Sequence, residues 1–476
     1  MKNNKLKIGL FGIGLEAYWM QFEGLQQRLE GYVKVVEEKL KGPNNSVINL
    51  GLIDNPEKAF QAGHDFRSAD VDIIFLYVTT YALSSTVLPV VRRAKVPIIV
   101  LNISPETSID YEYFNQMGNR SSMTGEWLAN CSACSLPEIA NVFKRAGIPF
   151  QQVTGTLYDD PVVWQELADW VAAAQVVNVM AHNRLGVMGN YYGGMLDIYT
   201  DMTLQCAIFG THIELLEVDE LSAICSTISD ELLAEKRKEF DAVFDVQDDC
   251  SEQELDKAAR TALALDQLVE RYQLGSMAYY HKGTGNPANE TSISTIILGN
   301  SLLTAKGIPV AGEYEIKNAQ AMKIMDSFGA GGSFTEYYAM DFRDDVVLMG
   351  HDGPCHAGIA EGKIKVKPLK EFHGKVGSGL SVEMSVKNGP VTLLSVVETA
   401  NGKLMLLIAE AESVAGPILE IGNTNSRYRF PIGAKAFVET WNLQGPAHHC
   451  AIGIGHIASK IRKFGTLLGV EVVQVC

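Results

Sequence analysis

The sequence predicts an α/β protein in which two Rossmann-like parallel-sheet domains are followed by a C-terminal β-rich, barrel-like domain. Three observations predict this fold class. Short apolar runs alternate with amphipathic stretches early in the chain, the alternation resumes near residue 176, and alternating apolar and polar residues replace it from about residue 362. The predicted domains span residues 1–166, 167–330 and 331–476.

The first domain is predicted from short strand-like runs separated by helical patterns. The strand-like runs are Lys7–Gly14, Val47–Ile53, Val71–Val78 and Val96–Ile103. Helical patterns follow the first run, to about Lys41, and fill residues 81–94. Strands alternating with helices in this way are typical of a parallel sheet with helices on its faces.

Glycines in the first strand-like run raise the alternative hypothesis that this domain binds a dinucleotide. They are Gly9, Gly12 and Gly14. Their spacing is not G-x-G-x-x-G, and no acidic partner for a ribose stands out. A nicotinamide-dependent dehydrogenase is therefore the weaker hypothesis.

The second domain again alternates strand-like and helical patterns, whereas the third shows the two-residue period of β-strands. Helical patterns are expected at 161–174, 251–272 and 291–305, and strands at 176–180, 213–218, 276–280 and 309–311. From Gly362 to Phe430 period-two segments surround Asn388-Gly389 and Asn401-Gly402, which indicates hairpins of an antiparallel sheet or barrel. A helix over 451–468 and a strand over 470–475 are expected last.

Composition narrows the class of function. The 476 residues carry a net charge of −16 and a pI near 5.1, so a large nucleic-acid or anionic-membrane surface is not expected. No apolar run is long enough to span a membrane, and the N-terminus does not read as a secretory signal. Eight scattered cysteines do not read as a disulfide framework, and Cys131-Ser-Ala-Cys134 is interpreted as an ordinary pair. The cytoplasm is the expected location.

Four places in the chain could carry chemistry. Glu313 follows Gly312 at the end of a strand-like run, Glu336 follows a glycine-rich stretch, His351 follows an apolar run, and the pair His448-His449 follows Gly445-Pro446. Two carboxylates and two imidazoles form a ligand set that suits Mn, Fe, Co or Zn. Carboxylates can also relay protons beside a carbonyl.

Each of these residues also has an ordinary structural interpretation. A glutamate after a glycine is often a turn or helix-cap residue. His448 and His449 could be a cap and a packed aromatic ring, and His356 beside Cys355 is interpreted as structural. The 136 positions between residues 313 and 449 do not by themselves force the four together.

Several separate motifs resemble those of L-arabinose isomerases, which are related to L-fucose isomerases. They are Met277-Ala-Tyr-Tyr-His-Lys-Gly-Thr284, the tract Gly299 to Glu313, Gly331-Gly-Ser-Phe-Thr-Glu336, Gly350-His351 and Gly445-Pro-Ala-His-His449. The resemblance extends from about Tyr111 to the C-terminus and includes Phe114-Asn-Gln116 and Trp164 to Trp170.

The resemblance implies a fold, a site and partners. It implies that Glu313 and Glu336 are catalytic glutamates that also bind the metal, and that His351 and His449 complete the ligand set. Gln116 and His448 match substrate contacts. The implied cofactor is Mn²⁺, or another divalent ion such as Co²⁺, Fe²⁺ or Mg²⁺. The implied partners are a small-molecule sugar and further copies of the chain, in a homo-hexamer or trimer with active sites between subunits.

The implied reaction is aldose–ketose isomerisation of an open-chain pentose or hexose, first of all L-arabinose to L-ribulose. One glutamate takes the proton from C2, and the other protonates or deprotonates the hydroxyl side of a cis-enediol intermediate. The sequence leaves open which glutamate has which role. The chain departs from the family after Gln116, where it reads Met117-Gly-Asn-Arg, and after His351, where it reads Asp-Gly-Pro-Cys-His. An isomerase for L-fucose or another sugar, or a non-catalytic sugar-binding homologue, remains the alternative.

Overall fold

The computed structural model describes residues 5–372 and 375–476 and divides the chain into two compact units. One unit runs to Asn178, and the other runs from Val179 to Cys476. The predicted boundaries near residues 166 and 330 stay predictions. The first residues of the basic N-terminal stretch and residues 373–374 lie outside the described residues.

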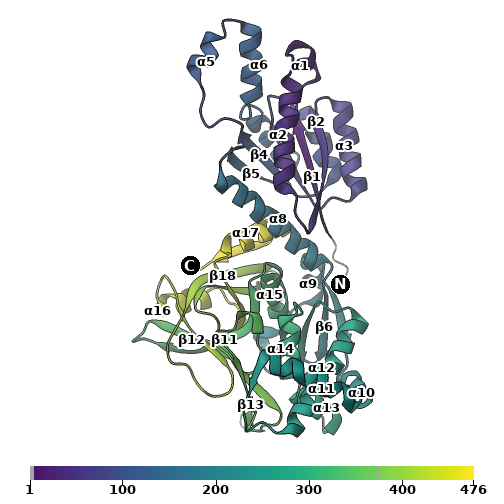
Figure 1. Ribbon diagram of the computed structural model, residues 1–476, viewed down its shortest axis with the longest axis vertical. Coiled ribbons are helices and arrows are strands. Elements are labelled where there is room, and N and C mark those ends of the chain that lie inside the picture. The colour runs from purple at the N-terminus through teal and green to yellow at the C-terminus, as the bar shows by residue number, and fades with distance from the viewer. Residues whose placement is uncertain (1–4, 373–374) are drawn as a thin grey trace. The chain divides into compact units, whose positions relative to one another are not determined.

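The unit that ends at Asn178 contains the first predicted parallel sheet (Figure 1). Its five strands are ordered β2-β1-β3-β4-β5, and every neighbouring pair is parallel. The strands are β1 (Leu6–Ile13), β2 (Asn45–Ile53), β3 (Ile73–Tyr77), β4 (Ile98–Ser104) and β5 (Phe150–Thr156). The helices are α1 (Glu16–Gln21), α2 (Leu25–Leu40), α3 (Pro56–Ala69), α4 (Leu88–Ala94), α5 (Tyr111–Gln116), α6 (Arg120–Asn130) and α7 (Leu136–Arg145), and α8 (Pro161–Ala181) runs across the division between the units. The Rossmann-like prediction for this part is confirmed.

Packing explains the glycines at the end of β1. A Cβ atom on Gly12 would lie 2.7 Å from Cγ2 of Val33, and one on Gly14 would lie 2.7 Å from the indole of Trp19. Trp19 donates to Oδ2 of Asp54, the buried acid that follows β2. Protein side chains therefore account for these glycines without a nucleotide.

The two cysteines between α6 and α7 form a disulfide, which corrects the expectation of an ordinary pair. Cys131 and Cys134 have Cα atoms 6.4 Å apart, within the range that a disulfide spans. The sequence did not reveal this pairing because nothing in the spacing alone fixes the path of the loop.

The second unit begins with a four-stranded parallel sheet ordered β10-β9-β6-β7. Its strands are β6 (Arg184–Gly189), β7 (His212–Leu216), β9 (Ser276–Tyr280) and β10 (Val310–Ala311). The helices are α9 (Met202–Phe209), α10 (Val218–Thr227), α11 (Asp230–Val243), α12 (Glu252–Tyr272), α13 (Pro287–Ser294), α14 (Ile297–Ala305) and α15 (Ile316–Ser327). The strand expected at 176–180 was wrong, because these residues end the long helix α8 and a short apolar run suits a buried helix equally well.

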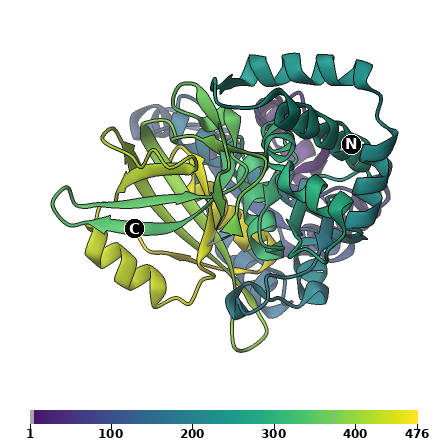
Figure 2. The ribbon, with the colours of Figure 1, turned by 90° about the horizontal axis from the view of Figure 1, so that it is seen from below.

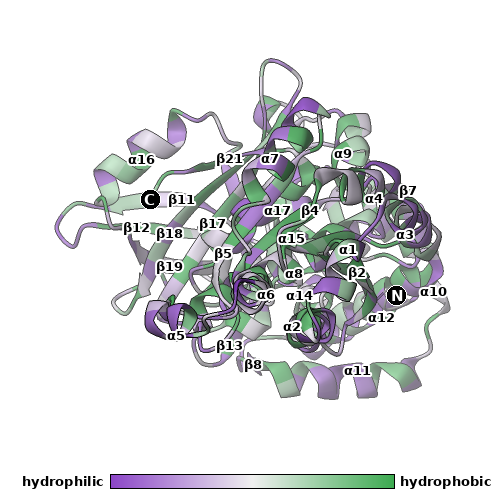
Figure 3. Cartoon of the chain, turned by 90° about the horizontal axis from the view of Figure 1, so that it is seen from above, coloured by the Kyte–Doolittle hydropathy of each residue, from purple (hydrophilic) through white to green (hydrophobic). Residues whose placement is uncertain are grey.

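A closed six-stranded barrel follows and confirms the predicted barrel-like domain. Its order is β17-β20-β11-β12-β19-β18, and pairing of β18 with β17 closes it, with β21 added outside β18. The strands are β11 (Gly331–Asp341), β12 (Val346–His351), β17 (Gly389–Glu398), β18 (Leu404–Val414), β19 (Thr424–Arg429), β20 (His449–Ile454) and β21 (Glu471–Gln474). Figure 2 shows the barrel, green to yellow, beside the teal helices of the parallel-sheet part. Hydrophobic residues predominate in β17 and β18 (Figure 3).

Some predicted details of this region differ from the structure. The barrel strands already begin with β11 at Gly331, before the period-two pattern that starts at Gly362. Within that pattern, β13 (Ile364–Pro368) and β16 (Leu380–Glu383) form a separate sheet with β8 (Phe244–Val246) rather than part of the barrel. The short pair β14 (Glu371–Phe372) and β15 (Lys375–Val376) lies between them in sequence. Asn401-Gly402 lies in the β17–β18 hairpin as predicted, whereas Asn388-Gly389 connects strands of different sheets.

The helix expected over 451–468 is divided in two. Residues 451–454 belong to β20, and the helix, α17, spans Ala458–Leu468 after Gly455, whose φ is +87°. A helix α16 (Ala434–Asn442) precedes β20. Residues 451–454 are only four apolar or small residues, followed by a glycine. So short a run shows no periodicity that would distinguish a strand from a helix.

Helix α15 is the central element of this unit. Every residue from Ile316 to Met325 is buried. It contacts β11, β17 and β20 of the barrel and also β9 and β10 of the parallel sheet. Barrel and sheet therefore share one hydrophobic core, and the N-terminus of α15 lies where the two meet. None of the helices in the described ranges is long and apolar enough to cross a membrane.

Candidate metal centre

Glu313 lies in a tight turn between β10 and α15. It and Tyr314 have φ values of 56° and 63°, in the left-handed region that costs a non-glycine residue energy. Such conformations persist where the surroundings impose them and are common at functional sites. The turn points the Glu313 side chain toward the barrel, where His351 and His449 lie within 4 Å of it.

The barrel register brings the other predicted ligands together. On β11, Glu336 pairs with Gly350 of β12 on one side and with His449 of β20 on the other. His351 is the next residue along β12. Three neighbouring strands thus present Glu336, His351 and His449 to the same end of the barrel.

Phe334 fixes the two imidazole rings. Its ring centroid is 4.4 Å from that of His351 and 4.3 Å from that of His449. The backbone of His351 is held as well, because its N–H donates to Oγ1 of Thr424 and its carbonyl accepts from the same hydroxyl, both at 2.9 Å. The rings are therefore positioned by packing in the protein itself.

The side chains converge on Glu313. Its Oε2 is 3.5 Å from Nε2 of His449 and 3.7 Å from Nε2 of His448, and its Oε1 is 3.9 Å from Nε2 of His351. Glu336 Oε2 is 3.9 Å from Nε2 of His448. The structure thus brings all four predicted ligands, and His448, into one cluster.

A buried carboxyl orients His449. Nδ1 of His449 is 2.5 Å from Oε2 of Glu315, the N-cap residue of α15, and both side chains are almost fully buried. Burial raises the pKa of Glu315 to about 8 and lowers the pKa of His449 well below its usual value. The neutral imidazole that results turns Nε2 toward Glu313, the form in which histidine binds metals.

A second carboxylate orients His448 in the same way. Oδ2 of Asp197 accepts from the backbone N–H of His448 at 2.9 Å and lies 2.6 Å from its Nδ1. Buried Lys317 donates to the backbone carbonyl of Asp197 and so ties the short 3₁₀ helix Leu196–Ile198 to α15. Burial opposes the charged form of His448, but the bond to Asp197 outweighs it, and the pKa of His448 is raised.

The carboxyl of Glu313, which faces the cavity, has a raised pKa. Burial, together with the charges of Glu336 and Glu315, raises its pKa to about 7, although His448 acts in the opposite direction. Within the described part of the chain, Oε2 of Glu313 and Nε2 of His449 are buried and have no hydrogen-bond partner. Burying polar atoms without a partner raises the free energy of the folded state unless they bind a ligand or an ion.

The donor set fits a divalent cation. One ligand atom each from Glu313, His448 and His449 lies within 4.8 Å of the others. Two ligand atoms about 2.1 Å from one ion at a tetrahedral angle are about 3.4 Å apart, close to the separations observed around Glu313. Imidazole and carboxylate ligands suit Mn, Fe, Co or Zn, and Mg less well.

A cavity of about 790 Å³ opens beside the cluster. Glu313, Glu336 and His351 line it, together with Tyr280 and Tyr338. A small molecule bound there would reach both carboxylates directly.

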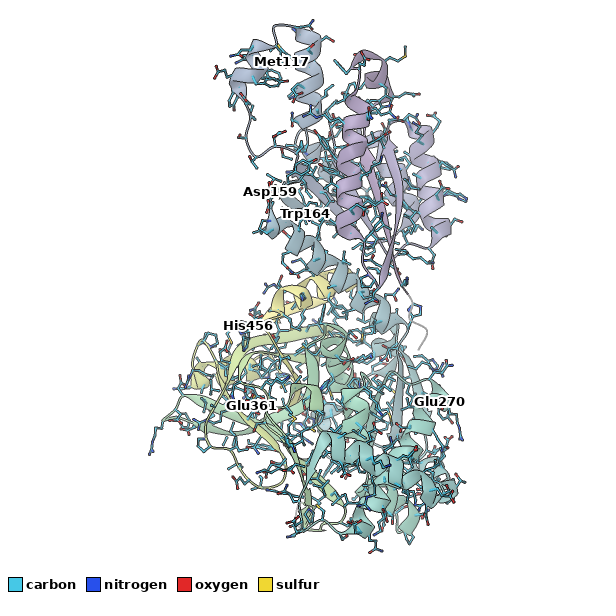
Figure 4. The ribbon with its side chains drawn as sticks, in the orientation of Figure 1. Met117, Asp159, Trp164, Glu270, Glu361 and His456 are labelled. Atoms are coloured by element: carbon cyan, nitrogen blue, oxygen red, sulfur yellow. A yellow bond between two sulfur atoms is a disulfide. The ribbon has the colours of Figure 1, made fainter. Side chains whose placement is uncertain are left out.

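Gln116, the other predicted substrate contact, belongs to the unit that ends at Asn178. It is the last residue of α5 and is exposed, and its amide donates to Glu112. Figure 4 labels the next residue, Met117, at the connection from α5 to α6. The role of Gln116 stays a prediction.

Sequence reasoning missed the residues that orient the two histidines. Glu315 stands two positions after Glu313, so a second acid at the start of a helix was a usable signal. Asp197 lies in a short 3₁₀ helix, Leu196–Ile198, with no recognisable motif and is 251 positions from His448. Only the fold could reveal that pair.

Comparison with known proteins identifies the barrel region. Residues 331–471 match the family of the L-arabinose isomerase C-terminal domain. No curated protein matches the chain.

The solved structures found are remote. They include a two-component system response regulator/GGDEF domain protein, with 9% identity, a TM-score of 0.21, and coverage of 68% of this chain and 98% of that one. An ABC transporter solute-binding protein from Burkholderia multivorans has 11% identity, coverage of 64% and 97%, and a TM-score of 0.15. The UDP-GlcNAc 2-epimerase from Methanocaldococcus jannaschii has 10% identity, coverage of 66% and 77%, and a TM-score of 0.14. At such TM-scores these likenesses carry no argument.

The matched domain includes three of the four predicted ligands, Glu336, His351 and His449, and His448 as well. It indicates a sugar isomerase, in agreement with the motifs. The comparison thus assigns residues 331–471, and with them Glu336, His351 and His449, to the family of the L-arabinose isomerase C-terminal domain.

Proposed function

We propose that the protein is a metal-dependent aldose–ketose isomerase that acts on an open-chain sugar by proton transfer through a cis-enediol. The observation that carries this proposal is the convergence of Glu313 and Glu336 with oriented histidines beside a cavity. L-Arabinose to L-ribulose is the first reaction to test. The cytoplasm is the proposed compartment.

The residues of the chain supply binding and proton transfer. His351 and His449 serve as ligands together with the two glutamates, and burial, which lowers the pKa of His449, keeps that ring neutral. Bound Mn²⁺ or a similar ion supplies Lewis-acid stabilisation of the negative charge that develops on the substrate oxygens. With a pKa near 7, Glu313 can take up and release a proton at neutral pH.

His448 is proposed to contact the substrate. Its Nδ1 is engaged by Asp197, so Nε2 faces the space between Glu313 and Glu336. From there it can hydrogen-bond a substrate hydroxyl. A homo-hexamer or trimer, with Gln116 reaching the site of a neighbouring copy, is proposed as the assembly.

The test is the conversion of a panel of aldoses to ketoses by metal-stripped protein, with and without added Mn²⁺. Wild type is compared with Glu313→Gln and Glu336→Gln, and Glu270→Gln on the exposed surface is the matched control (Figure 4). Turnover should require the ion and fall by about 10²- to 10⁴-fold in both site variants but not in the control. Ion binding without turnover of any sugar would indicate a sugar-binding homologue, and no ion binding would overturn the site.

A further inference from the structure

The disulfide between Cys131 and Cys134 stands apart from the other cysteines of the chain. Within the described residues the remaining cysteines are free, namely Cys206, Cys225, Cys250, Cys355, Cys450 and Cys476. Disulfides are rare in the cytoplasm, the compartment proposed for this protein, and those that form there are usually transient and catalytic or redox-sensing. A single bond in a chain that otherwise keeps free thiols therefore suggests redox chemistry.

The disulfide closes a very short ring, because its cysteines are only three positions apart in the sequence. In the chain-entropy account, the stabilisation that a disulfide gives to the folded state grows with the number of residues in the ring. This bond should therefore stabilise the fold less than most disulfides do. Cys-x-x-Cys beside a parallel α/β sheet is also the spacing of dithiol redox centres.

One end of the bond is accessible to a reagent in solution. Cys134 is exposed, whereas Cys131 is buried. The thiolate of a dithiol reductant can therefore attack Sγ of Cys134 and release Cys131 as a thiolate, which takes up a proton. The second thiol of the reductant then attacks the reductant's own sulfur in the mixed disulfide and releases Cys134 as a thiol. The protein gains two electrons and two protons, the reductant becomes a disulfide, and exchange with a small disulfide reverses these steps.

The disulfide lies where the α5–α6 arm, residues 111–130, is attached to the rest of its unit. Helix α5 has no buried residue, and the buried residues of α6 are Leu128 and Ala129, both in its last turn. The backbone carbonyl of Leu128 accepts from Oγ1 of Thr80 at 2.7 Å. Cys131 follows directly as the C-cap residue of α6. The attachment of the arm and the disulfide are therefore adjacent in the chain.

The residue after Cys134 is held in place by the segment that follows β3. Ser135 is fully buried, and its Oγ accepts from the backbone N–H of Ala82 at 2.9 Å. The disulfide thus ties the last turn of α6 to a fixed point. Elsewhere along α6, Glu126 forms an ion pair with Arg28 of α2 that is partly exposed and therefore contributes little.

We propose that Cys131 and Cys134 form a reversible redox site, in which a dithiol reductant opens the disulfide and so loosens the last turn of α6 together with the α5–α6 arm. The redox site does not depend on the proposed isomerase function. The arm carries Gln116, so on that proposed function the same change would also reach a substrate contact.

The first test is thiol labelling of the full-length protein. The folded protein is treated with oxidised glutathione or with dithiothreitol, and free thiols are then alkylated in denaturant and located by mass spectrometry. The peptide that contains Cys131 and Cys134 should carry no label after oxidation and two labels after reduction, and repeated cycles should restore each state. A pair that stays reduced in oxidised glutathione, or that dithiothreitol leaves oxidised, would overturn the proposal.

Hydrogen exchange of the same two states measures the effect on the arm. Amides of residues 120–130 should exchange at least about fivefold faster after reduction, whereas those of β1 and β3 should not change. Cys134→Ser, at an exposed position that should tolerate the change, should exchange like the reduced wild type in either reagent. Cys206→Ser, at a half-buried free cysteine, should respond as wild type does. Equal exchange of residues 120–130 in the two states of wild type would overturn the proposal.

Discussion

At the residue scale, the site combines a strained backbone turn with polar groups that are wholly or partly buried. Glu313 combines a left-handed backbone with a buried carboxyl, and its Oε2 has no hydrogen-bond partner within the described residues. Each of these features destabilises the metal-free fold. A cation bound between Glu313 and His449 would give a partner to both Oε2 of Glu313 and Nε2 of His449.

The titration of Glu313 predicts how ion affinity depends on pH. In the metal-free protein its pKa is raised to about 7 by burial, so below pH 7 an incoming ion must displace the proton. Affinity for Mn²⁺ should therefore rise with pH and level off above 7, by about tenfold between pH 6 and pH 8. Titration calorimetry at the two pH values measures this, and equal affinities would contradict it.

Substitution of Asp197 tests whether His448 contacts the substrate or binds the ion. Asp197→Ala releases both the ring and the backbone of His448, which Asp197 now holds. Turnover should fall about 10- to 100-fold while Mn²⁺ affinity changes less than about threefold, and Asp197→Asn, which keeps one acceptor, should be intermediate. Affinity lost in parallel with turnover would instead make His448 a ligand.

At the element scale, neighbouring strands set the distances in the site. Glu336, His351 and His449 come from three adjacent barrel strands, and Glu313 comes from the turn before α15. A shift of one residue in any of these strands would turn its ligand to the opposite face. The barrel register is thus part of the site.

A substitution at Gly350 tests this strand register. A Cβ atom there would lie 1.8 Å from the carbonyl oxygen of Thr424, so Gly350→Ala must separate β12 from β19. We expect a loss of about 3 kcal/mol or more in the free energy of unfolding, measured by urea denaturation. Gly31→Ala, in the exposed middle of α2 with open space around it, should instead add about 0.5–1 kcal/mol. Equal stabilities for the two variants would contradict the close approach.

The sequence predicted elements best where the pattern was long or repeated. The alternation of β1 to β4 with helices and the hairpin at Asn401-Gly402 were recoverable. The strand β20 was not, since its short apolar run precedes a true helix and carries no distinct period. Motifs predicted Glu313, Glu336, His351 and His449, which the fold brings together, but Asp197 depends on a contact between segments far apart in sequence.

At the scale of the whole molecule, the five converging side chains all belong to residues 179–476. Mn²⁺ should therefore slow hydrogen exchange around residues 310–356 and 445–454, and leave residues 5–178 unchanged. Mass spectrometry of the full-length protein, with and without the ion, measures both regions in one experiment. Glu313→Gln is the control in which the added protection should be lost. Protection confined to residues 5–178 would contradict the site.

The wide separation of the ligands in sequence has a consequence for biosynthesis. Residues 313 and 449 are 136 positions apart, which a ribosome translates in roughly 7 to 27 s at about 5–20 residues per second. Throughout that interval the nascent chain lacks the strand that completes the cluster. On the proposed function, the cation is therefore expected to bind late, and the ion acquired should depend on which metals surround the finished polypeptide.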